Sequence, residues 1–138
     1  MEIQISVRNL VEFVLRSGNI DNKRTAAPEN AMQEGGRIHR MIQRRMGSDY
    51  HAEVFLRHKE ETEKYTIIIE GRADGIIITP VGDLSQVPEL TDTTVAPSLR
   101  DQVTVTIDEI KGTYRDVQKM KEAVPVHLAQ AMCYAYIY

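Results

Sequence analysis

The chain has 138 residues, 42% of them apolar and 27% charged, which is typical of one globular domain. No apolar run approaches the roughly 20 residues of a membrane-spanning helix, and Glu2 follows Met1 where a secretion signal would be basic, so we expect a cytoplasmic protein without membrane contact. A single cysteine excludes an internal disulfide, and a net charge of −3 excludes a uniformly basic chain.

The first predicted element is a helix that begins after Ser6, a favourable N-cap residue. Apolar residues then recur at helical spacing until Gly18: Val7, Leu10, Val11, Val14 and Leu15. We expect this stripe to pack against the rest of the domain. Residues 19–27 are predicted to form a connection.

A second helix is predicted from Pro28 and Glu29 to about Gly47. The pair Gly35-Gly36 within it costs about 1 kcal/mol per glycine relative to alanine, which favours close packing of the helix against a sheet. The helix also lies in the most basic segment of the chain. Its arginines at three- and four-residue spacing share one face, which either contacts phosphates or is simply solvated: Arg37, Arg40 and Arg44.

The middle of the chain has the patterns of strands. Residues 51–56 alternate apolar and polar, and two apolar runs between Tyr65 and Thr79 flank a Gly-x-x-Asp segment, which predicts a three-stranded antiparallel meander. Residues 83–101 are predicted as a long loop. A β-branched run at 103–107 predicts a further strand, and Pro125 opens a final helix that has Gln130 and Tyr134 on one face.

Charged residues occur where these strands should be buried. Asp74 lies inside or beside an apolar strand, and Glu109 and Lys111 continue the buried face of the 103–107 strand. A divalent metal on the carboxylates, with the ammonium close to a water or a phosphate, would explain such charges. An exposed Glu/Lys pair is the simpler interpretation of these two residues alone.

Four motifs follow in order: Gly35-x-x-x-His39, Gly71-x-x-Asp74, Glu109-x-Lys111 and Gln130-x-x-x-Tyr134. This order resembles the PD-(D/E)XK nucleases, specifically the RecB-like branch, over residues 35–134. The resemblance implies an α/β fold with a mixed central β-sheet flanked by α-helices, the core found in restriction endonucleases. It also implies a Mg²⁺- or Mn²⁺-dependent deoxyribonuclease of DNA repair or recombination.

The resemblance further assigns roles to residues. His39, Asp74 and Glu109 would bind the metal, and Lys111 would act in catalysis with Glu109 and Asp74. Gln130 and Tyr134 would help position DNA, together with Arg37, Arg40 and Arg44. His127, one turn before Gln130, is a weaker candidate for a phosphate or water contact. Cys133 lacks the partners that an iron–sulphur cluster needs, so none is expected, and we expect it to be a packed thiol.

The N-terminal run from Ser6 to Phe13 and the segment from Glu34 to His39 also resemble the nuclease region that precedes an XPD/DinG-like helicase. We therefore expect residues 1–138 to be a single nuclease domain within a larger, nucleoid-associated protein that includes a helicase. The apolar, uncapped end at Tyr136-Ile137-Tyr138 adds an expectation of self-association through the last helix. An exonuclease is the first expectation. A structure-specific endonuclease or junction resolvase, and a non-catalytic DNA-binding module, are the alternatives.

Overall fold

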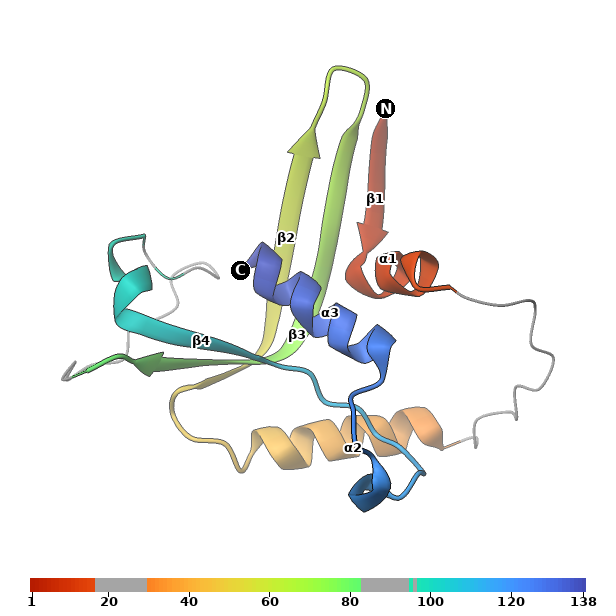
Figure 1. Ribbon diagram of the computed structural model, residues 1–138, viewed down its shortest axis with the longest axis vertical. Helices are drawn as coiled ribbons and strands as arrows, with labels where there is room; N and C mark the ends of the chain where they lie inside the picture. The colour runs from red at the N-terminus through yellow and green to blue at the C-terminus, as the bar shows by residue number, and fades with distance from the viewer. Residues whose placement is uncertain (17–29, 83–94, 96) are drawn as a thin grey trace.

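The computed structural model describes residues 1–16, 30–82, 95 and 97–138. Over these residues the chain forms a mixed four-stranded sheet flanked by three α-helices (Figure 1). The strands are β1 (Glu2–Ser6), β2 (Tyr50–Glu61), β3 (Thr66–Pro80) and β4 (Val103–Asp108). The predicted α/β class with a mixed central sheet is confirmed.

Strand β3 organises the sheet. Strand β2 pairs antiparallel along one edge of β3, and the other edge is shared by β1, parallel to residues 66–70, and β4, antiparallel to residues 75–80. Figure 1 shows β3 between β1 and β2 in the upper part, then turning at its foot to run beside β4. The β-branched runs at both ends of β3 favour this extended conformation.

The predicted three-stranded meander is wrong, because the two apolar runs belong to the single strand β3. Its Gly-x-x-Asp-Gly segment stays paired with β2, with Leu56 opposite Gly71 and Ala52 opposite Gly75. Four consecutive residues, 73–76, are buried, so the alternation of a flat strand is lost there. The glycines therefore bend the strand without ending it.

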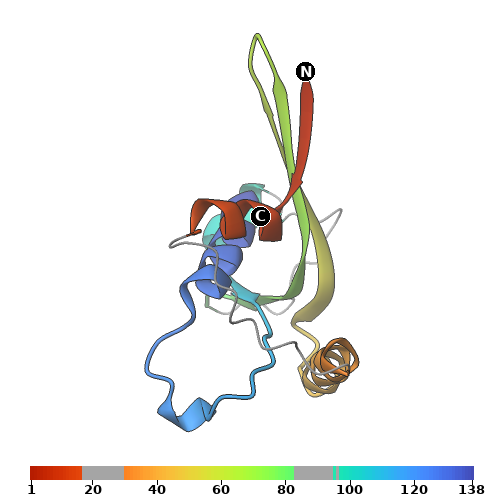
Figure 2. The same ribbon diagram turned by 90° about the vertical axis from the view of Figure 1, so that its right-hand side faces the viewer.

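The helices are α1 (Val7–Val14), α2 (Ala31–Gln43) and α3 (Pro125–Ile137), with short 3₁₀ helices at Pro97–Gln102 and Val117–Lys119. Helices α1 and α3 lie together on one side of the sheet, and α2 lies at the foot of the molecule, away from them (Figures 1 and 2). Ser6 caps α1 as predicted, since its Oγ accepts the Asn9 amide at 3.1 Å. Pro125 opens α3, also as predicted.

Other helix predictions need correction. The buried stripe of α1 includes Val7 and Val11, but Val14 and Leu15 are exposed. Figure 1 shows α1 extending beyond the β1 edge of the sheet. Helix α2 ends at Gln43 rather than near Gly47, and its expected start at residues 28–29 lies outside the described residues. Within the described part, a Cβ on Gly35 would meet no atom within 4 Å and one on Gly36 only the flexible Arg40, so the predicted close packing is wrong.

The hydrophobic core lies between α1 and α3 and the inner face of the sheet. Its buried members come from β2, β3, the start of β4 and α3, with contributions from α1 and residue 95: Val7, Val54, Leu56, Ala73, Ile76, Ile78, Val95, Val103 and Tyr134. Cys133 packs partly buried against this core, and burial raises its thiol pKa. Of the predicted loop 83–101, residues 83–94 and 96 lie outside the described part. None of the described helices is long and apolar enough to cross a membrane.

Candidate functional site

Asp74 lies at the bend of β3 and is bound from two directions. Its Oδ2 accepts the backbone amide of Ile110 at 2.7 Å, and its Oδ1 lies 3.3 Å from Nδ1 of His39 on α2. A buried carboxylate requires such partners, since an unpaired charge away from water is strongly unfavourable. The amide contact fixes the segment after β4 against Asp74. Glu109 and Lys111 therefore lie near Asp74 and His39, and we call this part of the fold the corner.

Glu109 and Lys111 come just after β4 rather than within it, because the strand ends at Asp108. The expected strand alternation therefore does not hold for them, yet the two side chains meet, with Nζ of Lys111 2.6 Å from Oε1 of Glu109. The side chain of Glu109 is only 5% exposed. Burial raises the pKa of its carboxyl, the Asp74 charge adds to the rise, and Lys111 and His39 oppose it.

One oxygen of this carboxylate has no partner. Oε2 of Glu109 is buried and accepts no hydrogen bond from any described residue. A buried acceptor of this kind costs free energy unless a donor or a cation reaches it. The neighbouring Asp74 and His39 are both close enough for their charges to act on Glu109.

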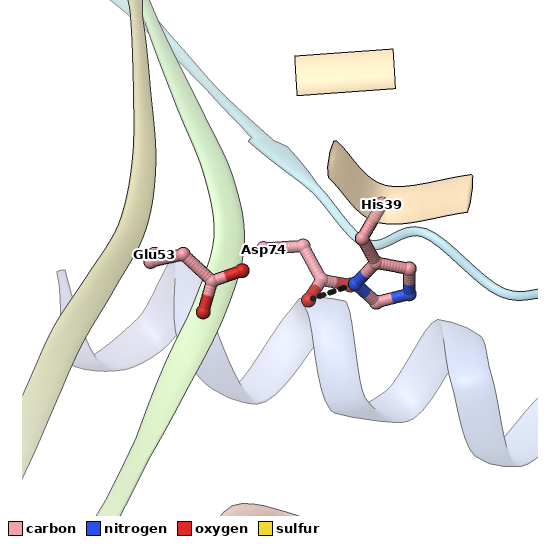
Figure 3. Close-up of side chains that lie close together, drawn as sticks. All are labelled: His39, Glu53 and Asp74. Carbon is pink, nitrogen blue, oxygen red and sulfur yellow. Dashed lines mark ion pairs between the residues drawn. The ribbon is translucent and has the colours of Figure 1, made fainter. Parts of the chain in front are cut away.

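A further carboxylate approaches from β2. Glu53 lies across from Asp74 in the β2/β3 pairing, between the pairs Ala52–Gly75 and Val54–Ala73. Ligand atoms of His39, Glu53 and Asp74 all lie within 4.8 Å of one another, and Figure 3 shows Asp74 between the other two. Glu109 is not part of this group, so its predicted role as the third ligand stays a prediction.

Helix α3 covers the inner side of the bend. Gln130 and Tyr134 are both buried on one face of α3, as their spacing predicts. The Tyr134 hydroxyl would lie 2.6 Å from a Cβ on Gly71, so this helix packs directly on the β3 backbone. Burial raises the Tyr134 pKa and the charges of Glu109 and Asp74 raise it further, while hydrogen bonds with Gln130 and the Arg72 backbone lower it.

A hollow of about 420 Å³ adjoins Lys111. Cationic and apolar side chains line it together: Lys111, Arg115, Val117, Met120, Val124 and His127. Burial lowers the pKa of His127, and the charges of Lys111 and Arg8 lower it further. His127 thus lies in an electropositive recess next to the Glu109/Lys111 pair.

The basic face of α2 lies outside this corner. Arg37, Arg40 and Arg44 are all exposed, and Arg37 forms an ion pair with Glu34 at 3.1 Å. His39, on the same helix, is only partly exposed and points to Asp74. Helix α2 thus presents exposed arginines as well as the histidine that reaches Asp74.

Several residues of the site were not anticipated from the sequence. Besides Glu53, Gln43 donates from Nε2 to the Asp74 carbonyl and to Glu53 Oε1, each at 3.0 Å, and the Tyr50 hydroxyl donates to Asp108 Oδ2 at 3.0 Å. Burial and then Asp108 raise the Tyr50 pKa well above its ordinary value. Glu53 could have been found from the hairpin turn, because the turn sets the register of β2 and β3. Glu61 pairs with Thr66, and counting the same number of residues away from the turn along both strands leads to Glu53 and Asp74.

The donors at this corner fit a hard divalent cation. His39, Glu53 and Asp74 offer two carboxylates and one imidazole from three separate segments, and the neighbouring Glu109 has a buried oxygen without a partner among the described residues. Oxygen ligands suit Mg²⁺ and Mn²⁺, and the imidazole favours Mn²⁺.

No family model, curated protein or solved structure matches the chain. The function must therefore be inferred from the chemistry of these residues.

Proposed function

We propose that this corner hydrolyses phosphodiester bonds in DNA with the help of Mg²⁺ or Mn²⁺. The single observation that carries the proposal is the pairing of Lys111 with a buried Glu109, whose second oxygen is unpartnered, beside the Asp74–His39 pair. A lysine held next to acidic metal ligands provides a cation for the reacting phosphate. The order of these residues along the chain, which resembles that of RecB-like nucleases, is in agreement.

In this proposal the metal ligands and Lys111 have different roles. His39, Asp74 and Glu109 would hold the cation, which would supply Lewis-acid chemistry and lower the pKa of a bound water. Glu109 Oε1 keeps the Lys111 ammonium at the edge of the site, where it is 34% exposed and able to reach a phosphate. Lys111 offsets the negative charge that develops as water adds to phosphorus and the bond to the leaving oxygen breaks.

Surfaces around the corner suit a nucleic-acid strand. The recess offers the cationic Lys111 and Arg115, together with the imidazole of His127, beside apolar walls, which match a phosphate and a sugar or base. Gln130 and Tyr134 underlie the reacting position, and Arg37, Arg40 and Arg44 offer a second basic surface for the DNA backbone. We propose an exonuclease of DNA repair or recombination that is cytoplasmic, nucleoid-associated and joined to a helicase.

The metal requirement is tested by two experiments on the purified chain. Cleavage of end-labelled single- and double-stranded DNA is expected with Mg²⁺ or Mn²⁺ and not with EDTA, and closed circular DNA should resist an exonuclease. In calorimetry, Asp74→Asn should lower Mn²⁺ affinity at least about tenfold, because losing even an outer-shell partner of a metal ligand costs about 10–100-fold.

The matched control is Asp101→Asn, which removes an exposed carboxylate outside the four motifs and should leave Mn²⁺ binding unchanged. Equal loss of affinity in both variants would indicate a non-specific charge effect. Cleavage that persists in EDTA would contradict the proposal.

A further inference from the structure

We propose that Glu53 is a further cation-binding residue, which holds the divalent ion together with His39 and Asp74. The inference rests on the proposed function, in that it requires the corner to bind a divalent cation. It adds a ligand from β2 that the motifs of the sequence do not contain. The ion would then be held between α2, β2 and β3.

The distances fit a shared ion. Carboxylate oxygens and imidazole nitrogens lie about 2.0–2.3 Å from such a cation, so two ligand atoms on opposite sides of it are about 4–4.6 Å apart. The ligand atoms of His39, Glu53 and Asp74 already lie within 4.8 Å of one another. Figure 3 shows the Glu53 carboxylate turned toward Asp74, and His39 lies on the opposite side of Asp74.

A second observation points to a ligand at this place. The carboxylate of Glu109 is nearly fully buried, and its Oε2 has no partner among the described residues, although Asp74 and His39 are close enough to influence it. Glu109 thus adds an unsatisfied buried acceptor near Asp74 and His39, and Glu53 faces the same aspartate from the neighbouring strand.

Glu53 is exposed, yet its carboxylate is held by two neighbouring side chains. Gln43 donates to its Oε1 and to the Asp74 carbonyl, which links the two acidic residues, and Arg72 lies 3.7 Å from its Oε2. Its backbone has a φ of 56°, a conformation that glycine and asparagine adopt more readily than glutamate. A position needed only for the turn of the backbone would therefore be better occupied by either of those residues.

That backbone conformation gives a direct test. In the whole chain, Glu53→Gly and Glu53→Asn remove the carboxylate while suiting the backbone, and Glu53→Gln keeps the side-chain size. Calorimetry with Mn²⁺ should show at least a tenfold loss of affinity in all three variants. The melting temperature in EDTA should be unchanged or higher for the glycine and asparagine variants. The matched control is Glu61→Gln on the same strand, which should leave Mn²⁺ affinity unchanged.

The possible outcomes separate this inference from the proposed function. If the wild-type chain binds Mn²⁺, and Asp74→Asn weakens binding while the Glu53 variants do not, Glu53 is no ligand and the proposed function stands. A lower melting temperature of the glycine and asparagine variants in EDTA, with Mn²⁺ affinity retained, would assign Glu53 a structural role instead. If the wild-type chain binds no Mn²⁺, both proposals are wrong.

Discussion

Asp74 is the residue on which the candidate site depends. Each of its carboxylate oxygens has a different neighbour, the Ile110 amide for Oδ2 and the His39 imidazole for Oδ1. Its backbone carbonyl accepts from Gln43 as well. One side chain thus joins α2, β3 and the segment that follows β4. The sequence predicted Asp74 as an unusual residue within an apolar strand, and the structure confirms that it is buried there.

His127 reports on the electrostatics of the recess beside Lys111. Its pKa lies below the ordinary value of about 6.5 because of burial and then because of Lys111 and Arg8. We expect Lys111→Ala to raise the His127 pKa toward the ordinary value, since one repelling charge is removed. An NMR titration of the imidazole measures this. Lys119→Ala is the control and should leave the His127 pKa unchanged.

The same shift has a consequence for stability. The unfolded chain takes up a proton on this histidine at a higher pH than the folded chain does. His127 therefore lowers the free energy of unfolding as the pH falls below about 6.5, and it has no such effect at higher pH. Chemical unfolding at pH 7.5 and pH 5.5 should show a smaller loss of stability in His127→Gln than in the wild-type chain. An equal loss in both would contradict the burial of this imidazole.

Single residues differ in how visible they are in the sequence. His39, Asp74, Glu109 and Lys111 stand out because charge interrupts an apolar or helical pattern. Glu53 does not, because β2 alternates and one of its faces is expected to be polar. Its neighbour across the sheet is set by the register, which depends on a turn that the sequence pattern did not identify.

At the level of elements, the glycines of β3 separate what the sequence could predict from what it could not. Glycines on both sides of a short polar segment indicate a break between two strands. The structure instead uses them for close contact: Tyr134 of α3 covers Gly71, and the Tyr50 ring covers Gly75. Contacts between distant segments decide between these two uses of glycine, and such contacts cannot be predicted from the local sequence pattern.

Two alanine substitutions test the close contact. Gly71→Ala should destabilise the fold by about 1–3 kcal/mol, because the new methyl group would meet the buried Tyr134 hydroxyl at 2.6 Å. Gly35→Ala in α2 should instead stabilise it by about 0.5–1 kcal/mol, because alanine favours a helix and space is open there. Urea unfolding of both variants measures the difference. Destabilisation by Gly35→Ala would restore the close packing first expected for α2.

For the whole molecule, the fold brings together segments that are far apart in the chain. Five segments contribute to the corner: α2, β2, β3, the segment after β4, and α3. Figure 1 shows how these elements are arranged. Local patterns determine where the chain is extended, and they also determine the helix start at Pro125 and the N-cap at Ser6. These features were therefore predictable. Strand β1 and its parallel pairing with β3 were not, because a five-residue strand needs its partner to become evident. Membership in a larger protein and self-association through α3 stay predictions.

The central proposal is that Lys111 acts on the reacting phosphate at a metal-dependent nuclease site. The most direct test is the single-turnover rate of DNA cleavage at saturating Mn²⁺, compared between the wild-type chain and Lys111→Ala. We predict a fall of about 10²–10³-fold, as for the loss of one group that stabilises charge in a transition state, with Mn²⁺ and DNA affinities nearly unchanged. Cleavage by Lys111→Ala at the wild-type rate, or no cleavage by the wild-type chain, would contradict it.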